Sequence, residues 1–320
     1  RDRSVSRGLG DVYKRQLTVR YDAAKYSVSS ITSYQYSDDE MTLDQDFTPE
    51  SWFTLRQARR EHALTEDIVF RSHDGRRYGW LLGAFGFYRH GVMEAPVHFK
   101  RTGIEELILK YANENDQSYR YSWGLKDGTG GDELFLGSDF RMPSAGGALY
   151  HESNYTLGRW RFTAGLRFDF EHARLRYRNY TDTWYTKTHI KNETAYERPI
   201  DIDDRSTLKQ TFTELLPKFS VMYSFDETRN LYLTIAKGYK SGGFNTQIFS
   251  DVLQQKMMNR MGIGEVYDVQ RGVAYKPEYS WNYEIGGHFS CMEGAVRGDF
   301  ALFYICLLYT SPSPRDTERS

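Results

Sequence analysis

Apolar and polar residues alternate along most of the chain with a period of two. In segment 160–171 every second residue is apolar, and the residues between them are charged, polar or glycine. The apolar set is Trp160, Phe162, Ala164, Leu166, Phe168 and Phe170. Alternate side chains of a β-strand point to opposite faces, so the segment predicts a strand with one apolar face. Its length reaches the roughly 9–11 residues with which a tilted strand crosses a bilayer.

The same alternation predicts eight further strands, and their connections alternate in length. The further strands are 26–36, 61–71, 78–88, 146–155, 218–225, 231–239, 281–290 and 296–305. Short turns at 72–77, 156–159, 226–230 and 291–295 alternate with long polar segments at 37–60, 89–145, 172–216 and 240–279. Loops beyond about 12–15 residues are uncommon in compact domains, whereas short turns at one rim and long loops at the other characterise transmembrane barrels.

Two shorter elements are expected inside the long segment 89–145. Residues 103–112 have a helical spacing of apolar positions and predict a short helix within the loop. Residues 118–126 alternate like a strand, but a membrane-crossing strand here would break the up-and-down order. We therefore expect 118–126 to stay within the loop, as the arm of a hairpin.

Alternation alone leaves a soluble β-sandwich or a carbohydrate-binding β domain open, because such strands also bury one face. Aromatic residues near the ends of the apolar faces favour a barrel, since they suit the two girdles of a membrane-embedded barrel. Examples are Trp80 and Tyr88, and Trp281 and Phe289. The predicted fold class is all-β, an antiparallel transmembrane β-barrel.

Composition narrows the class without identifying a site. The 320 residues carry 42 basic and 43 acidic side chains, which gives no bulk charge for binding nucleic acid. No run approaches the roughly 20 apolar residues of a membrane-spanning helix. The mean hydropathy of -0.67 is what half-polar strands and long polar loops produce.

Both ends of the chain look foreign to the middle. Residues 6–16, SRGLGDVYKRQ, and residues 306–316, CLLYTSPSPRD, resemble translations of one transposase-type sequencing adapter read in opposite orientations. We therefore expect residues 1–16 and 306–320 to be adapter-derived and residues 17–305 to be the interpretable part, with a net charge of -4. A basic arm and a Ser/Pro-rich tail are the alternative interpretation. Cys291 alone then remains, so no internal disulfide is expected.

Two strings carry a resemblance to a known family. Residues 217–245, PKFSVMYSFDETRNLYLTIAKGYKSGGFN, and residues 276–286, KPEYSWNYEIG, resemble the barrel of TonB-dependent outer-membrane receptors. The resemblance implies a barrel of about 22 strands, of which this sequence supplies 9–10, with the plug domain absent. It also implies energised uptake of a ferric siderophore, vitamin or glycan across the outer membrane of a Gram-negative bacterium.

The same resemblance sets the expected partners. These are outer-membrane lipid, a small nutrient or metal-chelate ligand, and the TonB complex, engaged through an N-terminal region outside this sequence. No nucleic acid, cofactor or catalysis is expected. An outer-membrane barrel enzyme and a soluble carbohydrate-binding domain remain the alternatives.

Two groups of residues are candidates for a role. The first shapes the entry and exit of strands: Lys237, Gly238, Tyr239, Gly242, Gly243, Phe244, Asn245, Pro277, Glu278, Trp281, Tyr283 and Glu284. Within it, Gly242 and Gly243 are expected to use positive φ where the chain leaves the wall, and Glu278 and Glu284 to lie on the polar face. The second is the densest aromatic group of a predicted loop: Tyr177, Tyr180, Trp184 and Tyr185. These rings either contact a ligand or pack the loop on itself.

Chemical motifs are otherwise weak. The acidic run Asp38, Asp39, Glu40, Asp44 and Asp46 could bind a cation, but a solvated anionic loop is the simpler interpretation. No phosphate-binding loop, nucleophile elbow or zinc-protease motif occurs. The sequence predicts a transport protein without metal ligands.

Overall fold

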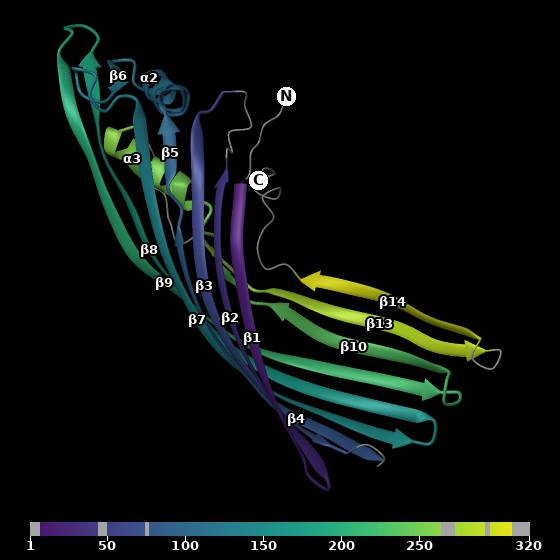
Figure 1. The fold of residues 1–320 in the computed structure, drawn as a ribbon. Coiled ribbons are helices and arrows are strands. Elements are labelled where there is room, and N and C mark those ends of the chain that lie inside the picture. The colour runs from purple at the N-terminus through teal and green to yellow at the C-terminus, as the bar shows by residue number, and fades with distance from the viewer. Residues whose placement is uncertain (1–6, 44–49, 74–76, 264–272, 292–294, 309–320) are drawn as a thin grey trace.

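A computed structural model describes residues 7–43, 50–73, 77–263, 273–291 and 295–308. Ten strands form one antiparallel meander in the order β1-β2-β3-β4-β7-β8-β9-β10-β13-β14 (Figure 1). Their bounds are β1 Arg7–Asp22, β2 Tyr26–Leu43, β3 Phe53–Ser72, β4 Tyr78–Glu94, β7 Glu133–Leu157, β8 Trp160–His189, β9 Ala195–Ser224, β10 Asn230–Lys240, β13 Glu278–Cys291 and β14 Val296–Leu308. All nine predicted strands are present, in an open, curved wall.

The tenth strand, β1, covers much of the segment that we assigned to an adapter. It pairs with β2 in one register over its whole length, from Arg7 to Asp22. An alternating segment can pair with a sheet edge whatever its origin, so the division into 1–16, 17–305 and 306–320 stays a prediction.

The prediction of a long loop at 172–216 is wrong. β8 and β9 are each 30 residues long and pair from Trp160↔Tyr223 to Thr188↔Ala195, so a five-residue connection replaces the expected loop. The alternation continues past Phe170, but the apolar residues change from even to odd positions, as Leu175 and Tyr177 show. This exchange of faces hides the strand from a search for one continuous apolar face.

The strand halves next to the short β7–β8 and β9–β10 connections lie lower in Figure 1, and we call them the lower halves. They have one exposed apolar face and one polar face. On β8, Trp160 and Phe168 are 46% and 47% exposed, and the apolar residues of β9 lie beside them, for example in Phe162↔Val221. We call this side the outer face and the opposite side the inner face. A single sheet with an exposed aromatic face contradicts the sandwich, in which these residues would be buried between two sheets.

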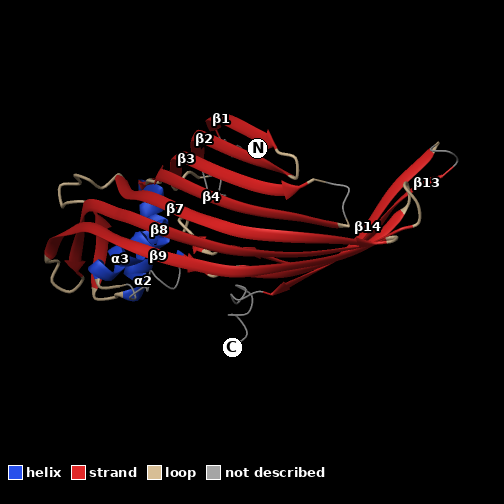
Figure 2. Ribbon diagram, turned by 90° about the horizontal axis from the view of Figure 1, so that it is seen from below, coloured by secondary structure: helices blue, strands red, loops and turns tan. Residues whose placement is uncertain are grey.

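The two ends of the wall differ, as the sequence indicates. Short connections join β7 to β8 and β9 to β10 at one end, and the helices gather at the other end (Figure 2). There the chain forms α1 Arg101–Ile104, η1 Glu105–Leu109, α2 Lys110–Asn115 and α3 Phe249–Met261, with short strands β5 Val97–Lys100, β6 Tyr119–Trp123, β11 Gly243–Phe244 and β12 Ala274–Tyr275. The helix expected at 103–112 is confirmed, and β6 pairs with the upper part of β8 rather than crossing a membrane.

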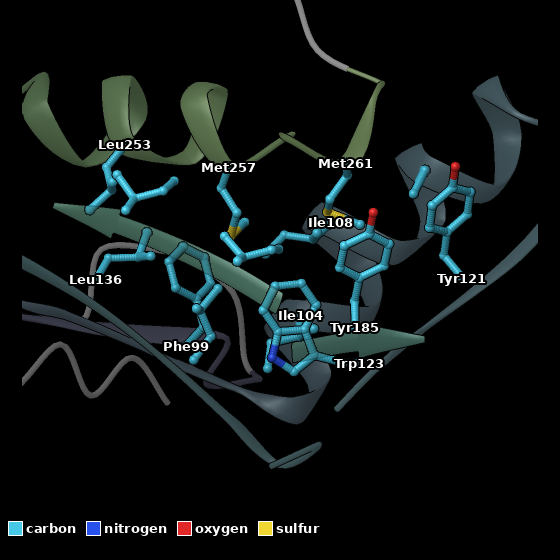
Figure 3. Packing of buried hydrophobic residues seen from close by; sticks show 14 of the residues in the cluster. Phe99, Ile104, Ile108, Tyr121, Trp123, Leu136, Tyr185, Leu253, Met257 and Met261 are labelled. Carbon is cyan, nitrogen blue, oxygen red and sulfur yellow. The ribbon is translucent and has the colours of Figure 1, made fainter. Parts of the chain in front are cut away.

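We call the helices and short strands at this upper end, with the strand ends that they cover, the lobe. The hydrophobic core lies in the lobe and not in the lower halves of the strands. Leu253, Met257 and Met261 of α3 point toward Leu136 of β7 and the side chains around it (Figure 3). The cluster also holds Val97, Phe99, Ile104, Ile108, Ala112, Tyr121, Trp123, Leu134, Tyr185, Ile200 and Ile202. A neighbouring cluster holds Met93, Ala95, Phe140, Leu175, Tyr177, Leu208, Phe249 and Val273. The helices therefore cover the inner face of the strands, where odd residues of β8 have become apolar.

In the described part of the chain, no helix has the length and apolarity needed to cross a membrane.

Candidate functional site on the inner face

Three carboxylates meet on the inner face just below the lobe. Asp169 and Glu171 are two residues apart on β8, and Glu214 of β9 is the direct cross-strand partner of Asp169. Their side chains are only 11–14% exposed. Like charges placed opposite each other repel and buried charges need partners, so this carboxylate cluster requires cations.

Each carboxylate has its own cation, supplied by a different strand or position. The Arg167 Nε lies 2.6 Å from Asp169 Oδ1, and Arg89 of β4 lies 3.5 Å from Glu171 Oε1. Lys237 of β10 donates to Glu214 Oε2 at 3.2 Å. The pairs link β4 to β8 and β9 to β10 across the inner face and leave a surface of mixed charge.

One residue of the predicted strand-entry and strand-exit group, Lys237, contacts this cluster. The Lys237 ammonium also lies over the Tyr279 ring, 5.1 Å from its centroid, and the Tyr279 hydroxyl donates to Glu214 Oε1 at 2.6 Å. On the same face, Glu284 accepts from the Tyr232 hydroxyl at 2.7 Å, in the polar position expected for it. Trp281 and Tyr283 of β13 pair with Cys306 and Tyr304 of β14.

The reason for glycine at 242 and 243 differs from the prediction. Positive φ in the described part of the chain occurs at Gly124, Gly128, Gly130, Gly158, Gly262 and Glu193, and neither Gly242 nor Gly243 has it. A Cβ on Gly242 would lie 2.5 Å from the Tyr275 carbonyl oxygen and 2.9 Å from the Phe212 ring. Close approach of the exit segment to β9 and β12 is therefore what excludes a side chain there.

The exit segment then leads into α3. The Gly243 carbonyl accepts from Gln210 Nε2 at 2.8 Å, the Asn245 amide donates to the Val273 carbonyl at 2.8 Å, and Phe244 packs against the second core cluster. These contacts fasten the segment to the inner face of β9. They support the structural role that the sequence indicates for this group.

The four aromatic candidates do not form one group. All four lie in β8 rather than in a loop, and alternation sends them to opposite faces. Tyr177 and Tyr185 are 7% and 5% exposed and belong to the two core clusters, where burial raises the pKa of both hydroxyls. Tyr180 and Trp184 lie on the outer face, and the Tyr180 ring stacks with the Arg178 guanidinium at 4.4 Å. Packing is thus the role that burial favours for Tyr177 and Tyr185.

Sequence reasoning missed the helix that forms the inner surface of the lobe. The exposed side of α3 carries Asp251, Gln255, Asn259 and Arg260, and Asn245 and Gln247 precede it. The spacing of Phe249, Leu253, Met257 and Met261 is the signal that could have revealed a helix in 240–279. This polar, amide-rich surface, with Asp251 and Arg260 as its charged members, lies above the carboxylate cluster on the same face of the wall.

The acidic run is partly neutralised by arginines of the neighbouring strand. Arg56 Nε lies 2.8 Å from Glu40 Oε1, and Arg60 Nε lies 3.5 Å from Asp38 Oδ2. Asp44 and Asp46 lie outside the described residues. Among the residues that the structure describes, no three His, Cys, Asp or Glu side chains gather as a metal site would require.

The described histidines do not assemble a Ser/His/acid group through their hydrogen bonds. His151 contacts the Ser153 hydroxyl at 2.9 Å on β7, whereas the histidine that contacts an aspartate is His288 of β13, beside Asp299. The two halves of a nucleophilic arrangement therefore lie on strands far apart in the sheet order.

A family model and several solved structures resemble this chain. A family model described as TonB dependent receptor-like, beta-barrel, matches residues 2–307. The chain is similar to the ferric yersiniabactin uptake receptor FyuA from Yersinia pestis, with a TM-score of 0.56 and 16% identity over 95% of this chain and 37% of that chain.

Two further solved structures are similar. For the ferric citrate transporter FecA in its unliganded form, the TM-score is 0.50, with 16% identity over 94% of this chain and 35% of that chain. For the siderophore receptor PiuA from Acinetobacter baumannii, the TM-score is 0.50, with 10% identity over 94% and 40%. No curated protein matches the chain. The chain thus spans less than half the length of these receptors.

Proposed function

Because the chain belongs to the TonB-dependent receptor-like β-barrel family, we propose that it forms part of the wall of an outer-membrane receptor that imports a ferric siderophore. The outer face is apolar and aromatic over a height that fits a bilayer, and the inner face is charged. The similar structures are receptors or transporters of ferric chelates, which favours that class over vitamins and glycans.

The observation that carries the proposal is the position of the lobe over the inner face. Helix α3 and the segment before it fold over the inner side of β7, β8 and β9, directly above the carboxylate cluster. A ligand arriving at the helical end would meet the amide-rich surface of α3 first and the charged inner wall next. Amide groups donate and accept hydrogen bonds without fixing a charge, which suits a polar chelate.

The contact residues follow from this path. We assign first contact to Gln255 and Asn259 on α3, and a supporting role to Tyr177 and Tyr185, which hold the strands beneath the helix. Tyr180 and Trp184 lie on the outer face of the lobe, away from this path, and stay separate candidates from the sequence. The TonB complex would energise uptake through parts of the receptor other than these strands.

The test is uptake by the complete receptor that carries this chain. Expression in a Gram-negative strain lacking its own siderophore receptors should give accumulation of ⁵⁵Fe from at least one class of ferric chelate, and only when TonB is present. The Gln255→Ala/Asn259→Ala variant should weaken ligand binding about tenfold, at one lost hydrogen bond of about 1 kcal/mol or less per residue. The matched control is Gln117→Ala/Asn192→Ala, two exposed amides outside α3. Uptake of a vitamin or glycan alone, or uptake without TonB, contradicts the proposal.

A further inference from the structure

Above the apolar part of the outer face, β7, β8 and β9 carry cations that face one another. Arg174 is the direct cross-strand partner of Lys209, and Arg176 is the direct partner of Arg141. All four positions have the outer-face parity that Phe168 and Phe170 have lower on β8. Directly opposite side chains lie about 4.5–5.5 Å apart at Cβ, and like charges in such pairs are destabilising.

In the described part of the chain, Arg174, Arg176 and Lys209 form no ion pair with an acidic side chain, whereas Arg141 lies near Asp139. The nearest acidic residues lie further from the apolar face. Asp203 accepts two bonds from Arg178, at 2.9 and 3.0 Å, and two from Arg205, at 2.9 and 2.6 Å, so its oxygens are occupied. Asp139 faces Arg178 in the strand register. The Arg174 Nε is buried without a hydrogen-bond partner. We call Arg141, Arg174, Arg176 and Lys209 the cation row. Three of its four cations, Arg174, Arg176 and Lys209, have no anionic partner in the described part of the chain, so the row can accept an anion.

The height of the cation row identifies which anion. Arg174 lies four residues above Phe170, about 13 Å along the strand at ~3.3 Å per residue, or about 10 Å in height at a tilt of ~40°. The headgroup region adds roughly 5–8 Å to each side of the hydrocarbon core. Long cationic side chains can bend toward the interface, so the charged ends reach the headgroups of the adjacent leaflet.

The chemistry of the row fits phosphate. Arginine presents a planar set of donors that matches phosphate oxygens, and such charge-assisted bonds are among the stronger ones. Thr207 is the direct partner of Arg176, and the Thr211 hydroxyl lies 2.9 Å from His172 Nδ1 at the upper edge of the apolar face. A hydroxyl and a ring nitrogen thus border the row on its membrane side.

We propose that the cation row binds the phosphorylated headgroup of an anionic lipid in the leaflet that surrounds the lobe. The headgroup neutralises cations that otherwise repel each other, and its acyl chains lie on the aromatic outer face below, continuous with Phe168 and Phe170. The inference rests on the proposed placement in a membrane, but not on the identity of the imported nutrient.

The experiment compares the complete receptor in nanodiscs of phosphatidylcholine with and without lipid A. The variant is Arg174→Gln/Arg176→Gln/Lys209→Gln, and the matched control removes three cations of the lobe away from the row, Lys110→Gln/Lys126→Gln/Lys191→Gln. Energy transfer from protein tryptophans to dansyl-labelled lipid A measures its enrichment at the protein. The enrichment of lipid A should fall about fivefold per cation removed in the cation-row variant and should change little in the control.

Stability provides the second readout. In phosphatidylcholine alone the cation-row variant should unfold at the same urea concentration as the unaltered receptor or a higher one, because the like-charge pairs are gone. In lipid A nanodiscs the order should reverse. Equal loss in both variants, no loss in either, or complete competition by millimolar inorganic phosphate would overturn the proposal, the last by indicating a site for a soluble anion. Lys209→Gln alone serves if the triple variant does not fold, and enrichment without ⁵⁵Fe uptake would refute only the proposed substrate.

Discussion

An arginine placed at mid-height on the outer face should destabilise the folded receptor far more than an arginine at the upper edge of that face. The apolar side of β8 runs from Trp160 to Phe170, ten steps of about 3.3 Å, which at a tilt of ~40° give about 25 Å in height. Leu166 is six steps from Trp160 and so lies within about 3 Å of the centre. Phe170 lies at the edge. Both side chains are nearly half exposed on the outer face, at 49% and 46%.

The expected cost follows from that depth. Arginine on the lipid face of a barrel costs about 2–4 kcal/mol at the midplane and about 0–1 kcal/mol near the interface. Leu166→Arg should therefore reduce the folding equilibrium constant by roughly 30- to 700-fold relative to Leu166→Ala. Phe170→Arg relative to Phe170→Ala should reduce it about fivefold at most. The alanine variants remove the contribution of the lost apolar side chain.

Urea titration of the complete receptor in phosphatidylcholine vesicles measures the difference, with folding followed by heat-modifiable migration on gels. Equal penalties at 166 and 170, or none at 166, would show that the face does not contact lipid. The assignment of inner and outer faces would then have to be reversed.

Three further outcomes test the lobe. Gly242→Ala should destabilise the exit segment by about 1–3 kcal/mol through overpacking against Phe212, seen as faster proteolysis within 241–277; Gly165→Ala, whose Cβ would meet its nearest atom at 3.6 Å, is the control, and equal rates would contradict the close-approach argument. Leu253→Ala removes a side chain with 0% exposure and should lower the stability of the folded lobe by about 2–5 kcal/mol. Hydrogen exchange should become faster over α3 and stay unchanged over 160–170; unchanged exchange in α3 would show that the helix is not held by this core. Arg205 and Arg178 hold the pKa of Asp203 well below its usual range, so its stabilisation is present at neutral pH and lost as the pH falls below the ordinary carboxyl value of about 3.9 toward the lowered one; urea titrations from pH 7 to pH 2 should show the advantage over Asp203→Asn shrinking only at the acidic end, and a constant difference would refute the pairing.

The sequence predicted some residues of the candidate site but not their partners. Lys237 and Glu284 stand out in the sequence because of the strings that contain them, and both lie on polar contacts of the inner face. Their partners could not be foreseen, because Glu214 and Tyr279 are 65 residues apart in the chain. Cross-strand register decides which carboxylate meets which cation, and a one-residue slip would move every side chain to the other face.

Tyr177, Tyr180, Trp184 and Tyr185 illustrate the limit of composition as evidence. Their density in the sequence predicted one aromatic group, but the period of two along β8 separates them into two buried and two outer rings. Odd or even position along the strand decides on which face each ring lies. That rule could be applied only once the segment was known to be a strand.

The sequence by itself determined the membrane-facing half of this protein. Below Phe170 the environment on each side is uniform, apolar outside and polar inside, so local alternation is sufficient to define strands, turns and faces. Only the tertiary structure decided the upper half. There the inner face is covered by α3 and the helices of 101–115, segments distant in sequence, and burial reverses which positions must be apolar. Because that reversal depends on long-range packing, the change from even to odd apolar positions in β8 could be interpreted only with the structure.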